Sequence, residues 1–290
     1  LADSAPIPAD TQEWEQQTER WKQQLLQKSF RAWPEKVNAI KPEVKTITKD
    51  GLVLQTISFD SQKHVPLDLF VVLPADSDAT KIEKINLVIL NQSDWEGDFK
   101  HIVSFFPGMQ AGNGASAESK KRFQEFRKQI LESGVPIAYF APRGIGLSEW
   151  NQNERKQVQI RRRFYLLGQS LEGMQVWDIR RAIQALKSQS DFSDAQLTLN
   201  ASGDAAVLCL YASLFETGIA ALELEGMPAS HQSGPALLNV LRYLDLPQTL
   251  AMAATRSPVI VSKVKPEDWK YPAEVSNKLD WDQSRLQIKK

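Results

Sequence analysis

The chain has few of the side chains from which metal sites and disulfides are built. Its 290 residues include one cysteine, Cys209, and three histidines. A lone cysteine excludes an intrachain disulfide and any cysteine-built zinc or iron–sulfur site, and three scattered histidines leave little for a histidine-built site. The sequence also lacks a Gly-x-Gly-x-x-Gly motif and a phosphate-binding loop. We therefore expect no metal ion and no cofactor.

Neither an excess of one charge nor a long hydrophobic run is present. The 35 Lys and Arg residues balance 35 Asp and Glu residues, so the formal net charge is zero. A neutral chain has no general attraction for nucleic acid or anionic lipid and would need a local basic patch to bind either. The longest apolar runs, such as 135–141 and 251–254, are far shorter than the roughly 20 residues that span a bilayer. We therefore predict no nucleic-acid partner and no membrane partner.

What is present is the composition of an ordinary globular protein, with 42% hydrophobic and 24% charged residues. Residues 1–10 are rich in Ala, Asp, Ser and Pro, which is typical of a linker. We interpret them as a linker or a trimmed chain start, with the natural protein continuing upstream. Residues 11–290 contain no internal repeat and are predicted to form a single domain.

That domain is predicted to begin with a helical arm over residues 11–34. Trp14, Trp21 and Leu25 have the spacing of one face of an amphipathic helix, with Gln, Glu and Lys between them. Asp10 stands where an N-cap residue would start the helix.

The rest of the domain alternates strand and helix patterns. Three β-branched or alternating segments come first and predict an antiparallel meander, over residues 44–48, 52–59 and 65–73. Short continuous apolar runs then alternate with longer helix-periodic stretches, which is typical of buried parallel strands with crossover helices. The predicted strands are 85–90, 136–140, 196–199, 220–224, 259–262 and, weakly, 285–288. The predicted helices are 117–133, 155–188 (divided in two), 204–216, 234–254 and 271–279.

The turn after the predicted strand 136–140 carries the first family resemblance. Its sequence, APRGIGLS at 141–148, resembles the Arg-Gly-x-Gly-x-Ser turn after the fourth sheet strand of many α/β-hydrolases. A leading antiparallel hairpin that feeds a parallel sheet is also the strand order of that fold. We therefore predict an α/β protein with the α/β-hydrolase fold: a mostly parallel eight-stranded sheet with an antiparallel start and helices on both faces.

The segment LTLNASGDAA at 197–206 lies where this fold places its nucleophile elbow, a strained strand-to-helix turn with small residues two before and two after the nucleophile. Two registers compete. With Ala201 and Ala205 as the small flanks, the nucleophile position is Gly203, which has no side chain to attack an ester. With Ser202 as the nucleophile, the flanks are the bulkier Asn200 and Asp204. The first register is favoured because it keeps the strand length and the small helix face.

The catalytic histidine of this fold follows the last strand, and the sequence contains no histidine after His231. Glu267 and Asp268, just beyond strand 259–262, occupy the usual place of the catalytic acid. Without an imidazole to orient, they are expected to be solvated loop charges.

Two longer stretches resemble a narrower family. They are IRRRFYLLGQSLEGMQVWDIRRAI at 160–183 and ELEGMPASH at 223–231, which continues to 242. Both are similar to the C-terminal half of long bacterial acetylxylan-esterase-like, or prolyl-oligopeptidase-like, proteins with two tandem α/β-hydrolase domains. That resemblance implies an upstream esterase domain and a downstream copy with glycine at the elbow, in agreement with Gly203.

A degenerate copy can still bind or react through other groups. His231, with Ser202 as nucleophile and Glu225 as acid partner, is the best substitute catalytic set, although a histidine that fixes a loop through hydrogen bonds is favoured. Glu223 and Glu225 alternate on one strand, so both face the same way, and a structural ion pair with an arginine of the 161–163 run is favoured over catalysis.

Two further groups are candidates for ligand binding. Arg161 and Arg163, with the arginines at 180 and 181, suit the carboxylates of uronate sugars, although internal ion pairs are favoured. Trp95 and Trp150 lie in loops after sheet strands, at the rim where sugars stack on aromatic rings.

We therefore predict a catalytically degenerate domain, or pseudoenzyme, of a carbohydrate-esterase protein, which acts as a scaffold or glycan-binding partner of the upstream esterase domain. One alternative is an active carboxylic-ester hydrolase with an irregular Ser/His/Glu site. The other is a structural dimerisation domain with an exposed apolar patch. The expected glycan is a plant or algal polysaccharide, which favours a periplasmic or secreted location over a cytoplasmic one.

Overall fold

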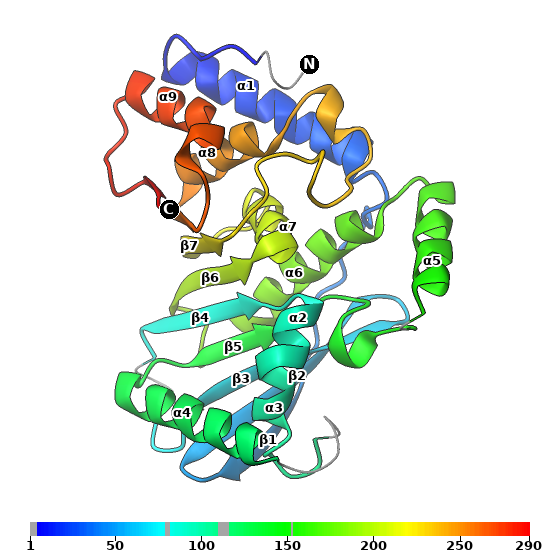
Figure 1. Cartoon of the computed structure of the whole chain (residues 1–290), viewed down its shortest axis with the longest axis vertical. Coiled ribbons are helices and arrows are strands. Elements are labelled where there is room, and N and C mark those ends of the chain that lie inside the picture. The colour runs from blue at the N-terminus through cyan, green and yellow to red at the C-terminus, as the bar shows by residue number, and fades with distance from the viewer. Residues whose placement is uncertain (1–4, 79–81, 110–115, 152) are drawn as a thin grey trace. The chain divides into compact units, whose positions relative to one another are not determined.

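The computed structural model describes residues 5–78, 82–109, 116–151 and 153–290 (Figure 1). The strands are β1 Glu43–Lys49, β2 Leu52–Gln62, β3 Val65–Pro74, β4 Lys84–Ile89, β5 Ile137–Phe140, β6 Gln196–Ser202, β7 Ile219–Glu225, β8 Val259–Ser262 and β9 Leu286–Ile288. The helices are α1 Thr11–Gln24, α2 Gln92–Asp94, α3 Lys100–Val103, α4 Ala117–Ser133, α5 Glu154–Leu166, α6 Leu171–Lys187, α7 Gly203–Ser213, α8 Leu246–Arg256 and α9 Lys270–Lys278.

The strands form one sheet of nine, in the order β1-β2-β3-β5-β4-β6-β7-β8-β9. β2 pairs antiparallel with β1 and β3, and β3 pairs antiparallel with β5, whereas the pairs β4–β5, β7–β8 and β8–β9 are parallel. The antiparallel start and mostly parallel sheet are therefore confirmed. The sheet has nine strands rather than the predicted eight, because the weakly predicted last segment pairs with β8 through Val259 and Leu286.

The chain folds into two compact units. Unit 1 contains the described residues up to Val37 together with Trp150–Arg180 and Asn200–Lys290, and unit 2 contains Asn38–Glu149 and Arg181–Leu199. Each unit has its own core, and each is described by itself.

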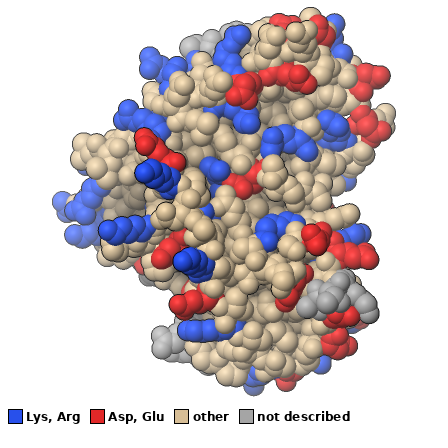
Figure 2. All heavy atoms as spheres, turned by 180° about the vertical axis from the view of Figure 1, so that it is seen from behind, with Lys and Arg blue, Asp and Glu red and all other residues tan. Residues whose placement is uncertain are grey.

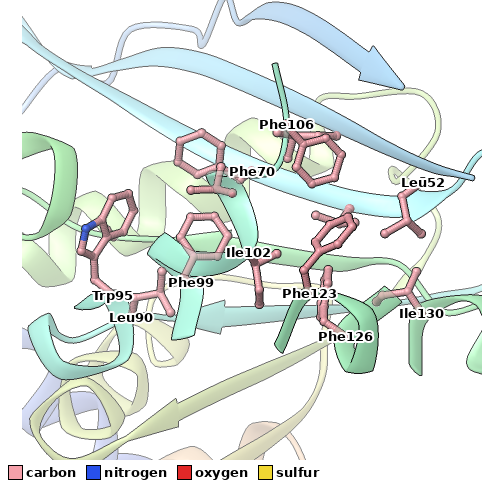
Figure 3. Close-up of a cluster of buried hydrophobic side chains, with 14 residues drawn as sticks. Leu52, Phe70, Leu90, Trp95, Phe99, Ile102, Phe106, Phe123, Phe126 and Ile130 are labelled. Carbon is pink, nitrogen blue, oxygen red and sulfur yellow. The ribbon is translucent and has the colours of Figure 1, made fainter. Parts of the chain in front are cut away.

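The core of unit 2 is an aromatic-rich cluster between its sheet strands and α4. Phe123, Phe126 and Ile130 are spaced along one face of α4, and all three are buried. Figure 3 shows them in one buried cluster with Phe70, Phe99 and Ile102. Burial of this apolar stripe fixes α4 on the sheet, because every large side chain on that face is removed from water. The full buried set is Leu52, Leu54, Phe70, Val72, Leu90, Trp95, Phe99, Ile102, Val103, Phe106, Phe123, Phe126, Ile130 and Ala141.

In unit 1, α1 begins as the sequence predicts. The Asp10 side chain accepts a hydrogen bond of 2.9 Å from the Glu13 backbone N–H, so the predicted N-cap is confirmed. Trp14 and Trp21 are buried, and Trp14 Nε1 donates to Thr255 Oγ1 at 2.9 Å. A single π-helical turn, Leu25–Ser29, ends the helix.

The central helix of unit 1, α7, is buried along nearly its whole length. Every residue from Ala205 to Ser213 is buried, including the thiol of Cys209. A helix that is apolar all round belongs in the interior of a fold, and α7 follows directly on β6 without an intervening loop.

The predicted division of residues 155–188 into two helices is confirmed by α5 and α6. The predicted helix 234–254 is wrong in its first half, because α8 starts only at Leu246. Asp245 and Gln248 form a capping box there, with proline in the first turn, and these are strong start signals. Asn239 upstream is in the left-handed conformation at φ 63°, which a continuous helix does not allow.

Candidate functional site

The turn between β6 and α7 has the backbone strain of a nucleophile elbow, and the strained residue is Gly203. Its φ is +54°, whereas Ser202 before it is extended at φ −125°. The small residues two before and two after it, Ala201 and Ala205, are both buried. This is the arrangement of the first predicted register, in which the position of the nucleophile belongs to Gly203.

There is room for a side chain at this position. A Cβ atom added to Gly203 would meet nothing within 4 Å. The left-handed backbone therefore favours glycine here, whereas crowding does not exclude a side chain. Ser202 stands at the N-cap position of α7, but its hydroxyl does not cap the helix.

His231 lies in the turn after β7 and is nearly buried, with 9% of its surface exposed. Its Nδ1 is 2.7 Å from the carbonyl oxygen of Pro235, and its Nε2 is 2.8 Å from the hydroxyl of Tyr211. A carbonyl only accepts, so Nδ1 carries the proton and Nε2 accepts from Tyr211. Thr249 Oγ1 lies 3.1 Å from the same Tyr211 hydroxyl and extends the chain of hydrogen bonds.

Burial lowers the pKa of His231, although the Pro235 carbonyl and the Asp245 carboxylate act in the opposite direction. The neutral imidazole fits the hydrogen bonds, because a protonated ring would have to donate from both nitrogens. Burial also raises the pKa of Tyr211, so its hydroxyl keeps its proton.

Asp245 holds the backbone of this turn. Its Oδ1 accepts from the His231 and Leu246 backbone N–H groups, each at 2.8 Å, and its Oδ2 accepts from Ser230 Oγ at 2.6 Å. One carboxylate therefore caps α8 and fixes the turn that carries His231. This agrees with the prediction of a histidine that fixes a loop.

Two members of the substitute catalytic set of Ser202, His231 and Glu225, namely His231 and Glu225, make other contacts. Both ring nitrogens of His231 bond to Pro235 and Tyr211. Glu225 is exposed on β7, where its carboxylate bonds to Lys263 Nζ at 2.5 Å. Only Leu222 and Leu224 of this strand are buried. The strand β7 is therefore buried on one face and not on both.

The arginines take two different roles. Arg161 pairs with the buried Glu172, not with the glutamates of β7, and Arg180 donates to Glu216 at 2.7 Å. These are the internal ion pairs that the prediction favoured. Arg163 is exposed on α5, beside the equally exposed Arg162. Of the arginines proposed for anion binding, Arg163 and Arg161 are exposed, the latter with 46% of its side-chain surface, whereas those at 180 and 181 are not.

The two tryptophans predicted at a sugar-binding rim also differ. The prediction for Trp95 is wrong, because this residue is only 4% exposed and packs against Phe99 and Gly146 in the core of unit 2. A loop position after a strand suggested the rim, but residues 95–99 form a π-helical turn that folds the ring inward. Trp150 of unit 1 is 48% exposed, with its ring centroid 6.0 Å from that of Phe164.

The residues that sequence reasoning missed are the partners of His231, namely Tyr211, Thr249 and Asp245. Tyr211 and Thr249 lie on helices α7 and α8, and no local pattern links them. Asp245 carried a readable signal, since aspartate followed by proline and then glutamine at the third position predicts a helix start.

Within the described residues, no group of three or more His, Cys, Asp or Glu side chains is placed to hold a metal ion. In the same part of the chain, the search for helices able to cross a membrane found none.

Comparisons with known proteins identify the fold. No family model and no curated protein matches the chain. Among solved structures, a proposed acetyl xylan esterase from Bacteroides fragilis superposes with a TM-score of 0.71 at 13% identity, covering 99% of this chain and 79% of that one. A glucuronoyl esterase from Solibacter usitatus gives 0.64 at 15% identity, with coverages of 97% and 83%. Acetyl xylan esterase 1 from Thermoanaerobacterium sp. gives 0.54 at 10% identity, with coverages of 99% and 88%.

These likenesses are structural, because the sequence identities are low. They establish that the chain has the α/β-hydrolase fold, with its antiparallel start and parallel continuation. The neighbours named above are carbohydrate esterases. A shared fold does not carry their substrates over to this chain.

Proposed function

We propose that this protein is a catalytically degenerate carbohydrate-esterase-like domain, which serves as the non-catalytic partner of an esterase domain in the same polypeptide. The observation that carries the proposal is the elbow. Gly203 holds the strained position between β6 and α7, and glycine supplies no nucleophile.

The state of His231 supports the same conclusion. A general base must be within hydrogen-bond reach of the proton that it removes. Here Nδ1 donates to the Pro235 carbonyl and Nε2 accepts from Tyr211, so the imidazole is engaged on both sides. No histidine occurs between His231 and Lys290.

Helix α5 supports the role as a partner. None of its residues is buried, and Leu166 and Leu167 at its end are 86% and 72% exposed. Burial against another surface would remove these two adjacent leucines from water. In Figure 2, blue side chains gather at the left edge, where α5 lies. The basic residues of α5 are Arg155, Lys156, Arg161, Arg162 and Arg163. A net charge of zero for the whole chain does not reveal such a local cluster.

The catalytic part of the proposal is tested by hydrolysis of p-nitrophenyl acetate and acetylated xylan by the purified chain, beside Ser202→Ala and His231→Ala variants. We expect all three proteins to match the buffer blank. Turnover by the wild type that both substitutions abolish would instead establish the irregular esterase site and overturn the assignment of the elbow to Gly203.

The partner role needs a separate test. The coding sequence upstream of Leu1 should encode an α/β-hydrolase domain with an intact triad. That domain, produced separately, should bind this one, and the double variant Leu166→Ser, Leu167→Ser should weaken binding about tenfold or more. Leu131→Ser, at a leucine of α4 that is 38% exposed, is the matched control and should bind like the wild type. An upstream sequence without such a domain contradicts the proposal.

A further inference from the structure

An open cavity of about 500 Å³ lies at the end of α9 in unit 1. It is lined by one aromatic and five polar residues: Ser276, Asn277, Asp280, Trp281, Asp282 and Gln283. The aromatic ring offers a flat apolar surface, and the other side chains offer hydroxyl, amide and carboxylate groups. This lining allows stacking on one side and hydrogen bonds in several directions.

The ring of Trp281 is held in place before any ligand arrives. Its centroid lies 6.2 Å from that of Trp14, with the two rings at 62°. The Arg285 guanidinium lies 5.9 Å from the Trp281 centroid, and Arg285 itself is anchored by donating to the Thr255 carbonyl at 3.0 Å. Figure 1 shows α9 next to α1, the helix that carries Trp14. A fixed ring binds a ligand without the entropy loss of ordering a side chain.

The polar groups around the ring are available for binding. Within the described residues, the side chains of Asn277, Asp280 and Gln283 form no hydrogen bond, and all three are exposed. Asp282 accepts a hydrogen bond of 2.8 Å from the Ser284 backbone N–H, and the hydrogen bonds from Ser284 lower the pKa of this carboxyl group. The cavity therefore offers two amides and at least one carboxylate that stays ionised at neutral pH.

We propose that this cavity binds a neutral sugar unit of a polysaccharide. The C–H face of the sugar ring lies on Trp281, and its hydroxyl groups bond to the amides of Asn277 and Gln283 and to the carboxylates. The proposal rests on the carbohydrate-directed function proposed above, and it adds a site apart from the elbow.

The charge of the lining selects among ligand classes. Two aspartates line the cavity, and one cation, Arg285, lies beside Trp281 and Asp282, so the carboxylates outnumber the guanidinium and uronates, nucleic acids and anionic lipids are disfavoured. A bare divalent cation prefers six or more oxygen ligands, and within the described residues no group of three or more His, Cys, Asp or Glu side chains is placed to hold a metal ion. A neutral polyol matches the mixture of amides, carboxylates and aromatic surface.

The test is titration of the full chain with xylohexaose, followed by isothermal calorimetry and tryptophan fluorescence. We expect saturable binding below about 10 mM. The double variant Asn277→Ala, Gln283→Ala should weaken it about tenfold. Trp281→Phe should weaken it while retaining an aromatic ring against Trp14. Gln124→Ala removes an exposed amide from α4 and should bind like the wild type.

Three outcomes would overturn the proposal: no saturable binding of xylohexaose, binding that the double variant leaves unchanged, or a stronger response to calcium chloride alone than to the sugar. A xylo-oligosaccharide carrying glucuronate should bind more weakly than the neutral one, and the reverse order would place the glycan contact elsewhere, at a basic surface. The p-nitrophenyl acetate assay above contains no sugar, so failure of the sugar site and failure of the proposed degeneracy are separate results.

Discussion

At the scale of single residues, burial decides what His231 can do. Both ring nitrogens are satisfied, and the surrounding protein lowers its pKa below the ordinary value of 6.5. In the unfolded chain the imidazole takes up a proton near that ordinary value, whereas in the folded chain it does so only at lower pH. The stability that the neutral ring contributes is therefore present above pH 6.5 and is lost as the pH falls through the folded pKa.

We accordingly expect the free energy of unfolding to fall when the pH is lowered from about 7.5 to about 5, as measured by urea denaturation. The variant His231→Gln should lose part of this pH dependence. The variant His64→Gln, at an exposed histidine, is the control for the loss of one imidazole. Equal slopes for the wild type and His231→Gln would contradict the prediction.

Gly203 provides the second prediction at this scale. Gly203→Ser places a hydroxyl at the elbow, where a Cβ meets nothing within 4 Å, but the backbone stays at a φ of +54°. We expect a loss of stability of about 1–2 kcal/mol, the cost of a left-handed side chain, and no gain in ester hydrolysis because His231 is already engaged. The matched control is Gly97→Ser, since Gly97 also has open space but an ordinary φ. Hydrolysis by Gly203→Ser above the blank would show that a base is within reach.

At the scale of elements, the turn after β5 packs against the π-helical turn that carries Trp95. A Cβ atom on Gly146 would lie 2.5 Å from Cδ2 of the Trp95 ring, and the φ of Gly146 is +62°. A buried indole in the core of unit 2 cannot move aside as a flexible side chain does.

We expect Gly146→Ala to lower the free energy of unfolding by about 2–5 kcal/mol, the sum of backbone strain and overpacking. Gly226→Ala separates the two contributions, because its φ is +58° and a Cβ there meets nothing within 4 Å. Gly226→Ala should lower the free energy of unfolding only by the contribution of backbone strain. Thermal or urea unfolding of both variants measures the difference. Equal losses in the two variants would mean that Trp95 yields to the methyl group.

Element boundaries also show where a sequence pattern suffices and where it fails. The Asp10 cap of α1 and the division between α5 and α6 follow from local signals, and both are confirmed. The late start of α8 was missed because the apolar residues between 234 and 245 mimic helical spacing, while Asp245 and its proline outweigh that spacing.

At the scale of the whole molecule, the sheet was predictable because buried parallel strands leave continuous apolar runs in the sequence. The strand-to-helix turn at Gly203 was predictable because strand, small flanks and helix are adjacent in the chain. The hydrogen bonds of His231 were not predictable, because its partners are distant in the chain. Tyr211 lies 20 residues before His231, and Thr249 lies 38 residues after Tyr211. The exposure of a loop side chain was not predictable either. Trp95 and Trp150 both follow sheet strands in the sequence, but in the structure Trp95 is buried and Trp150 is exposed.

Cys209 turns the buried helix α7 into a reporter. Its thiol is fully enclosed, and burial raises its pKa, so the reactive thiolate is suppressed in the folded protein. A disulfide reagent such as Ellman's compound should therefore react only when α7 opens. Because this chain carries no second cysteine, each labelling event can be assigned to that helix without mutagenesis. The rate of colour development therefore measures how often unit 1 opens. Any ligand or partner that stabilises this unit should lower that rate.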